Sequence, residues 1–293
     1  MTLNRGHTYA ELVPAADEGA TLLAWLTRRH DHSDAHAWAA RLAAGELAID
    51  DAVTHDDARL RRNQRVTWAR PPWNEPDVPR DVTVCLHDDD VVVVNKPSGL
   101  PTMPAGGFLD HTLLVIVRER WPDASPMHRL GRGTSGLVLF ARTPRARSAL
   151  QAAFREGGID KRYLTRVTGS PAWDTLTIDT PIGPVEHPLL GTLHAATPDG
   201  RASRSHATVL SRRADDAVVQ VGIDTGRPHQ IRIHMASVGH PLVGDPLYGV
   251  GGTPRTDALP GDLGYDLQAA TLTFPHPRDG ARVTVHAPKP DWL

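Results

Sequence analysis

The hydrophobic positions of the first seventy residues predict a small module of two helices and a hairpin. Leucine and tryptophan side chains recur at helical spacing within residues 17–29, with acids before them and arginines after them. A second helix is predicted in AHAWAARLAAG, which Gly45 would end. The runs ELAID and QRVTW, with the polar stretch DAVTHD between them, predict short edge strands.

Beyond this module, apolar runs of strand length are interrupted at irregular intervals by helical patterns. A hairpin is predicted around the acidic turn 88–90, and the run VVVVN that follows is typical of a buried strand. Helices are predicted in HTLLVIVRERW, ARSALQAAF and HQIRIHMASVG, and strands in GLVLFART, KRYLTRVTG, RSHATVLS, AVVQVGID and ATLTF. This irregular order favours an α+β fold with a mixed or antiparallel sheet and packed helices over a doubly wound parallel sheet.

Proline content separates the two parts. Residues 71–80 hold four prolines and are predicted to form a stiff linker. We therefore predict a small module over residues 1–70, a linker over 71–80 and a larger domain over 81–293.

Composition narrows the class of protein. No apolar run approaches the roughly 18 residues that a membrane span needs, and the first thirty residues lack a signal-peptide pattern. The single cysteine, Cys85, cannot form an internal disulfide, and there is no C-x-x-C pair to hold zinc. We expect a cytoplasmic monomer that binds neither metal nor membrane.

The net charge of −2 hides a basic segment. Between Arg118 and Arg166 there are eleven basic and four acidic side chains, a net charge of +7. Such a segment is either a solvated basic face or a surface that meets phosphate groups, because local charge governs contact with nucleic acid. Composition leaves both interpretations open.

Three glycines, Gly131, Gly133 and Gly136, spell the G-x-G-x-x-G pattern of a dinucleotide-binding loop. That loop needs a strand before the glycines and a helix after them, because the pyrophosphate binds at the helix N-terminus. Here the β-type run LVLFART follows the glycines, and a poor strand precedes them. The pattern therefore argues against a nucleotide-dependent oxidoreductase, which stays a remote alternative.

The segment HRLGRGTSGLVLFA, residues 128–141, resembles the signature of RluA-type pseudouridine synthases, usually HRLDxxTSGLLL. Three further segments are similar to motifs of that family in the same order: VVVVNKPSGLPTMP, KRYLTRVTG and TGRPHQIRIHMASVGHPLVGDPLYG. The resemblance covers roughly residues 80–293. The N-terminal module more weakly resembles the alpha-L RNA-binding domain that is often fused to such enzymes.

The resemblance implies that the protein isomerises uridine to pseudouridine in structured RNA, either ribosomal or transfer RNA, without a cofactor or metal. By similarity, Arg129 would fill the space left by a flipped base, Tyr163 would stack on the uracil, and Arg232 would pair with the catalytic aspartate. The remaining residues expected to bind RNA or uridine are His128, Arg132, Lys96, Lys161, Arg227 and His229.

The aspartate itself is absent, because Gly131 stands at its position. Glycine offers neither a nucleophile nor a base. Three hypotheses stay open: a noncatalytic RNA-binding protein, a carboxylate supplied from elsewhere, or related chemistry by other means. Asp110 and Asp224 are candidate replacements, whereas we assign Asp245 a structural role. A buried Arg232 without its partner would carry an uncompensated charge, at a cost of about 3–5 kcal/mol.

Overall fold

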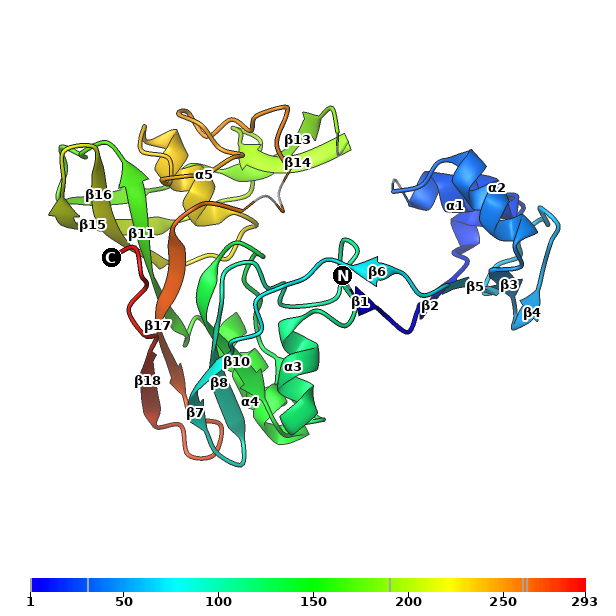
Figure 1. The fold of residues 1–293 in the computed structure, drawn as a ribbon, viewed down its shortest axis with the longest axis horizontal. Coiled ribbons are helices and arrows are strands. Elements are labelled where there is room, and N and C mark those ends of the chain that lie inside the picture. The colour runs from blue at the N-terminus through cyan, green and yellow to red at the C-terminus, as the bar shows by residue number, and fades with distance from the viewer. Residues whose placement is uncertain (1, 31, 190, 260, 262) are drawn as a thin grey trace. The chain divides into compact units, whose positions relative to one another are not determined.

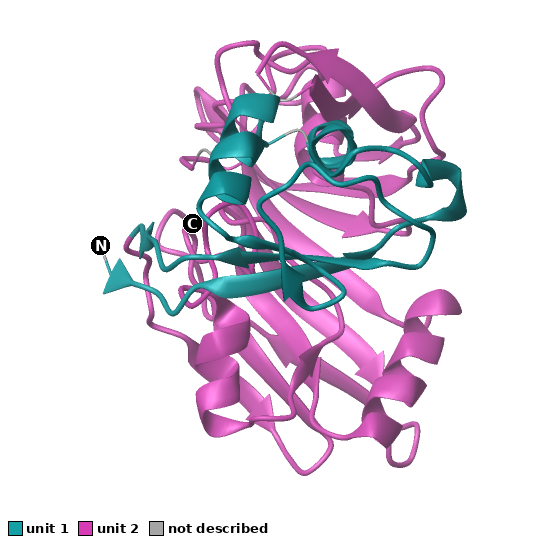
Figure 2. Cartoon of the chain, turned by 90° about the vertical axis from the view of Figure 1, so that its right-hand side faces the viewer, with its two compact units in different colours: residues 1–76 teal, residues 77–293 magenta. Residues whose placement is uncertain are grey.

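A computed structural model describes residues 2–30, 32–189, 191–259, 261 and 263–293. The chain forms two compact units, Met1–Pro76 and Asp77–Leu293 (Figure 2). The division falls inside the proline-rich segment between Pro71 and Arg80, and the boundaries expected from the sequence stay a prediction.

The first unit packs two helices on a four-stranded antiparallel sheet. Its helices are α1 (Leu22–Arg29) and α2 (Ala35–Ala43), capped by the side chains of Thr21 and Asp34. The sheet order is β2-β5-β3-β4, from β2 (His7–Leu12), β3 (Leu47–Ile49), β4 (Ala52–Val53) and β5 (Arg65–Arg70); β1 (Thr2–Leu3) pairs with β6 (Asn74–Glu75). Trp25 and Trp38 fill the core of this unit.

The second unit is built on a ten-stranded sheet whose main path runs β12-β15-β16-β11-β17-β10-β8-β7 (Figure 1). The path comprises β7 (Thr83–His87), β8 (Val91–Lys96), β10 (Ser135–Ala141), β11 (Asp160–Thr168), β12 (Thr175–Ile178), β15 (Ser205–Arg212), β16 (Asp216–Ile223) and β17 (Leu267–Pro275). At its margins β9 (Ser125–Pro126) pairs with β10 and β18 (Arg282–His286) pairs with β17. Within the described residues, β10 and β17 run parallel and the other paired strands run antiparallel.

Alternating side chains of the central strands divide the core of this unit into two layers. Val138 and Phe140 of β10 face one layer, which α3 (Leu113–Arg120) covers with Leu113 and Val117. Leu137 and its same-face neighbours meet α4 (Pro144–Arg155) in the other layer. The basic segment between Arg118 and Arg166 therefore includes helices on both faces of the sheet.

Helix α5 (Gln230–Ser237) is buried on nearly every side. Its residues Ile233 and Ala236 pack with Leu193 of β14 (Gly191–Ala196), which forms a hairpin with β13 (Ile182–His187) (Figure 1). A helix buried on all sides must place its polar side chains against partners, and this requirement shapes the site described below.

The α+β class and the mostly antiparallel sheet agree with the expectation from the sequence pattern. The helices and most of the longer strands lie where the hydrophobic pattern predicts them. Strand β4 lies in DAVTHD, where the sequence predicts a turn, and the strands outside every predicted element are β1, β2, β6, β9, β12, β13, β14 and β18. Among the described helices, none is long and apolar enough to cross a membrane.

We expect Gly136→Ala to destabilise the larger unit by about 3 kcal/mol. Gly136 has a φ of +107°, and a β-carbon there would lie 2.4 Å from the carbonyl oxygen of Ala269 on the neighbouring strand. The loss combines backbone strain with a steric clash. Urea unfolding measures it. Gly226→Ala, at a site with no atom within 4 Å and no positive φ, is the matched control; equal stability of the two variants would contradict the expectation.

Candidate functional site

The first two glycines of the G-x-G-x-x-G pattern, Gly131 and Gly133, precede β10, and the third, Gly136, lies within this strand; no helix follows them directly. Strand β10 begins at Ser135 and pairs with β8 and β17. The pyrophosphate site of a dinucleotide-binding loop, which needs a helix N-terminus at this point, is therefore not formed here.

Lys96 fixes the loop that carries the first two glycines. Its side chain is fully buried, and its ammonium group donates to the carbonyl oxygens of Pro97, Leu100 and Arg132 at 2.9, 2.7 and 3.2 Å. Burial lowers the pKa of this ammonium to about 7. The predicted contact between Lys96 and RNA is corrected by this geometry, because the side chain ties two turns together beneath the surface.

Arg232 of α5 forms the most deeply buried ion pair among the described residues. Its Nε and Nη2 donate to the two carboxylate oxygens of Asp245 at 2.7 and 2.6 Å, and the two side chains are 2% and 1% exposed. Burial opposes the charge of Arg232, but the hydrogen bonds to Asp245, together with charge interactions with Tyr265, Asp245 and Tyr248, outweigh it and raise the pKa of the guanidinium. The charge of the buried Arg232 is therefore compensated by a carboxylate of the chain itself, Asp245.

Asp245 has no capacity left for chemistry on a substrate. Besides the guanidinium, its Oδ1 accepts from the backbone N–H groups of Leu247 and Tyr248 at 2.9 and 3.1 Å. A carboxylate that is buried and bonded in this way is a poor nucleophile, because an attack would break the bonds that hold it. Asp245 anchors Arg232, in agreement with the structural role assigned to it from the sequence.

Two tyrosine rings enclose the guanidinium of Arg232. Its Cζ lies 4.2 Å from the ring centre of Tyr265 and 5.0 Å from that of Tyr248, distances at which a cation is attracted to an aromatic face. Its third nitrogen, Nη1, is buried and has no hydrogen-bond partner among the described residues. We call Arg232 with its partners Asp245, Tyr248 and Tyr265 the arginine clamp. The Nη1 nitrogen of this clamp is left without a hydrogen-bond acceptor among the described residues.

Tyr163 lies in the same part of the core. It is buried on β11 and belongs to one apolar cluster with Leu130, Ile231 and Tyr265. Burial raises the pKa of its phenol to about 12, so the ring is neutral at physiological pH. The cluster brings together Tyr163, the helix that carries Arg232 and the loop that begins at Leu130.

Residues 131–134, which we call the glycine loop, pack against the side chain of Tyr265. A β-carbon at Gly131 would lie 3.5 Å from the hydroxyl oxygen of Tyr265 and 3.7 Å from Oγ1 of Thr134, which is ordinary van der Waals contact. A β-carbon at Gly133 would lie 2.8 Å from two ring atoms of Tyr265, which is too close for any side chain. Gly131 is exposed and Gly133 is buried. No sequence signal pointed to Tyr265, which lies more than 130 residues from the loop.

The segment before α5 is held by Gln230 and His229. Gln230 is buried; its amide donates to the carbonyl of Arg204 and to Ser205, and its Oε1 accepts from the backbone N–H of Arg227 and from Thr225. His229 has a φ of 54° and its Nδ1 bonds the hydroxyl of Tyr248 at 2.8 Å. Burial lowers the pKa of His229 to about 3, so its ring stays neutral.

The other predicted RNA-contacting residues are spread over both faces of the sheet. His128 and Lys161 both contact Phe154 of α4, in the layer opposite Tyr163. Burial, followed by the charge of Lys161, lowers the pKa of His128 to about 3, and its Nε2 accepts from the backbone N–H of Leu139. These two side chains are therefore not brought together with Tyr163 and Arg232.

The three arginines predicted to bind RNA differ in exposure and in the contacts of their side chains. Arg129 is exposed, which fits a side chain that enters RNA. Arg132 donates through Nε to the carbonyl of Gly99 and lies over the ring of Phe108. Arg227 donates twice to the carbonyl of Ala202. Arg129 is thus the member of this group best placed to reach a ligand.

The two carboxylates considered as replacements do not form the pair with Arg232, which Asp245 takes. Asp224 is exposed and its carboxylate bonds His206 at 3.0 Å. Asp110 is partly buried in the turn before α3 and has partners of its own. The contacts of Arg232 with described residues give neither of them a place beside the guanidinium.

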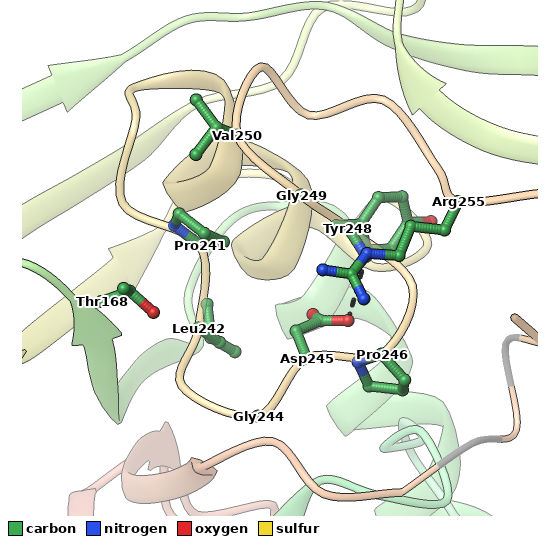
Figure 3. A pocket seen from close by; sticks show the side chains of 10 residues that line it. All are labelled: Thr168, Pro241, Leu242, Gly244, Asp245, Pro246, Tyr248, Gly249, Val250 and Arg255. Carbon is green, nitrogen blue, oxygen red and sulfur yellow. Dashed lines mark hydrogen bonds between the residues drawn. The ribbon is translucent and has the colours of Figure 1, made fainter.

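A surface depression of about 470 Å³ adjoins the ion pair (Figure 3). Residues 241–250 form most of its wall, with Asp245 and Tyr248 among them and Arg255 at its side. None of the residues expected from the sequence to form the site lines this depression. It therefore touches the arginine clamp through Asp245, whereas Gly131 and Tyr163 lie outside its lining.

One group of side chains in the described part of the chain has metal-binding geometry: Asp88, Asp90 and His276. Asp88 already accepts from two backbone N–H groups of its turn and from His276, and Asp90 pairs with Arg278. These contacts join the β7–β8 turn to the segment after β17. We interpret the group as a tie between turns.

Comparison with known proteins places these features in context. Residues 90–237 match the family model of RNA pseudouridylate synthase. The chain is 39% identical over 277 residues to a Synechocystis protein named as an uncharacterized RNA pseudouridine synthase, covering 93% of this chain and 95% of that one. It is 35% identical to RNA pseudouridine synthase 5 of Oryza sativa, covering 99% and 88%.

Two further matches extend the comparison. Ribosomal large subunit pseudouridine synthase D of Vibrio parahaemolyticus is 33% identical, covering 75% of this chain and 70% of that one. The structure of human RNA pseudouridylate synthase domain containing 1 superposes with a TM-score of 0.58 at 26% identity, covering 74% of this chain and 87% of that chain.

We expect Asp245→Asn to destabilise the larger unit by about 3–5 kcal/mol, because it leaves the buried charge of Arg232 without a counter-charge. Urea unfolding of the full chain measures the loss. The double variant Arg232→Met with Asp245→Leu removes both charges and is expected to recover at least half of it. A single variant as stable as the wild type would show that the pair does not hold this region together.

Proposed function

This chain belongs to the RluA-type RNA pseudouridine synthases, and we propose that its substrate is a uridine in structured ribosomal RNA. Membership rests on the family match and on relatives that cover nearly the whole chain. The choice of ribosomal RNA draws support from the relative named for the large ribosomal subunit.

The observation that carries the proposal is the arrangement around Tyr265. The arginine clamp, the glycine loop and the cluster that contains Tyr163 all meet this ring. Gly131 is exposed, so a ligand can approach the hydroxyl of Tyr265 across it. A uridine inside an RNA helix must leave the stack to arrive there, at a cost of a few kcal/mol.

Arg129 supports the same interpretation from outside the pocket. Its side chain is exposed two residues before Gly131, and no described residue forms an ion pair with it. A planar guanidinium stacks well on bases, so Arg129 is suited to occupy the place of an extruded base. We also propose that the protein acts in the cytoplasm as a monomer without a cofactor or metal.

A second candidate function, noncatalytic RNA binding, has one observation in its favour. Position 131 carries no carboxylate, and the carboxylate nearest to Arg232 is fully bonded. Such a site would bind a uridine without rearranging it. The two functions share the surface and differ in turnover, so a direct assay separates them.

The deciding experiment incubates the purified protein with ribosomal RNA transcripts that lack modification, and then maps pseudouridine at single-nucleotide resolution. We expect conversion at one or a few uridines. Transfer RNA transcripts in parallel test the choice of RNA. RNA binding with no conversion in either set would favour the noncatalytic function.

We expect Gly131→Asp to raise the rate of pseudouridine formation about 100-fold, a typical gain for a well-placed acid–base group. The site accepts a β-carbon, and the added carboxylate would lie within reach of the Tyr265 hydroxyl. Gly131→Asn is the matched control, with the same shape and no charge, and should give no such rise. A folded Gly131→Asp protein with unchanged turnover would show that the pocket is no longer arranged for catalysis.

A further inference from the structure

Tyr265 places a polar group beside the position where the family carries its aspartate. The residue lies two positions before β17, is 6% exposed and bonds Oγ1 of Thr134 at 3.3 Å. Its hydroxyl oxygen lies 3.5 Å from the β-carbon position of Gly131. Only the hydrogens of an exposed glycine separate this hydroxyl from a ligand that approaches over residue 131.

The two glycines of the loop relate to Tyr265 in different ways. Gly133 makes room for the ring, because a β-carbon there would lie 2.8–2.9 Å from Cε1, Cζ and the hydroxyl oxygen. Gly131 places no side chain over the hydroxyl. A side chain at position 133 would collide with the ring, whereas one at position 131 would meet the hydroxyl at ordinary van der Waals distance. The two glycines of the G-x-G sequence thus leave the space that the side chain of Tyr265 occupies.

The backbone holds Tyr265 from both sides. Gly264 approaches Gly244 so closely that a β-carbon on Gly244, which has a φ of +75°, would lie 2.0 Å from the Gly264 carbonyl oxygen. Asp266 pairs with Arg166 at 2.7 Å, and its carbonyl accepts from Thr165 at 2.6 Å. A group held this firmly is preorganised for a specific contact.

The guanidinium of Arg232 supplies a fixed positive charge next to this phenol. It lies over the ring at 4.2 Å, and its Nη1 has no hydrogen-bond partner among the described residues. A cation over the ring lowers the energy of negative charge that develops on the phenol oxygen. The phenol of Tyr265 therefore lies between a fixed cation and the exposed position 131.

We propose that the Tyr265 hydroxyl is the acid–base group that carries the proton in the isomerisation, an inference that rests on the proposed function. The reaction breaks the N1–C1′ bond of uridine, forms a C5–C1′ bond and moves one proton from C5 to N1. The phenol gives its proton to the released uracil ring, and the phenolate, stabilised by Arg232, takes the proton from C5. The tyrosine is regenerated and no other reactant is consumed.

The test is Tyr265→Phe in the full chain, which removes one oxygen and leaves the ring that packs on Arg232. We expect the single-turnover rate at saturating ribosomal RNA to fall about 100-fold or more, while the Kd for RNA stays within about threefold. A role in packing alone would leave the rate unchanged, because the hydroxyl has one described partner, Thr134. Tyr9→Phe, in the first unit, is the matched control for the loss of a phenol oxygen.

A second measurement separates failure of this inference from failure of the proposed function. The chain has only four tyrosines, so carbon-13 labelling at tyrosine Cζ gives four signals, and Tyr265→Phe assigns one of them. Uridine 5′-monophosphate should shift the Tyr265 signal.

The outcomes are distinct. Active wild type with unimpaired Tyr265→Phe overturns the proton-carrying role and leaves the proposed function intact. Inactive wild type overturns the proposed function. In that case a shifted Tyr265 signal supports the contact with uridine, and an unmoved signal overturns the inference entirely.

Discussion

The buried ion pair between Arg232 and Asp245 is the constraint on which the site depends. Removing two charges from water costs several kcal/mol per ion, and only good geometry with further hydrogen bonds offsets that cost. Here the pair is bidentate, and two backbone N–H groups donate further hydrogen bonds to Oδ1 of Asp245. The loop that carries Asp245 and the helix that carries Arg232 must therefore adopt one relative position. Tyr248 and Tyr265, which enclose the guanidinium, are fixed by the same requirement.

The elements that the sequence predicts correctly are those whose own residues carry the signal, such as a continuous apolar run or a capping residue. VVVVN and GLVLFART are continuous apolar runs, and they become the central strands β8 and β10. The helix at 144–155 begins at a threonine cap followed by proline, which are local signals. By contrast β13 and β14 hold glycine, proline and histidine, and they form a hairpin because α5 offers Ile233 and Ala236 as a packing surface.

The roles of single residues at the site divide in the same way, into those that a local motif indicates and those that depend on contacts with distant segments. Arg232, Tyr163 and the glycine loop could be located by resemblance, because each lies in a motif. Sequence order could not show that Lys96 points inward to three carbonyls, since the pattern N-K-P also suits an exposed turn. Nor could it show that the sheet separates His128 and Lys161 from Tyr163. Lys161 and Tyr163 are two residues apart on β11 and would share a face of a regular strand, but the pairing with β17 shifts register between Arg162 and Tyr163. Tyr265 stands in no motif and acquires its place through contacts across the sheet.

The parallel pairing of β10 and β17 explains why Tyr265 can stand where a residue of the glycine loop is expected. Ser135 pairs with Gln268 and Gly136 with Ala269, so the two strands start at the same edge of the sheet. The segments that lead into them, 131–134 and 264–266, must therefore arrive side by side. A functional group at this edge can come from either segment without a change of fold. The loss of an acid from one segment and the presence of a phenol on the other are alternative ways to equip the same position beside Arg232.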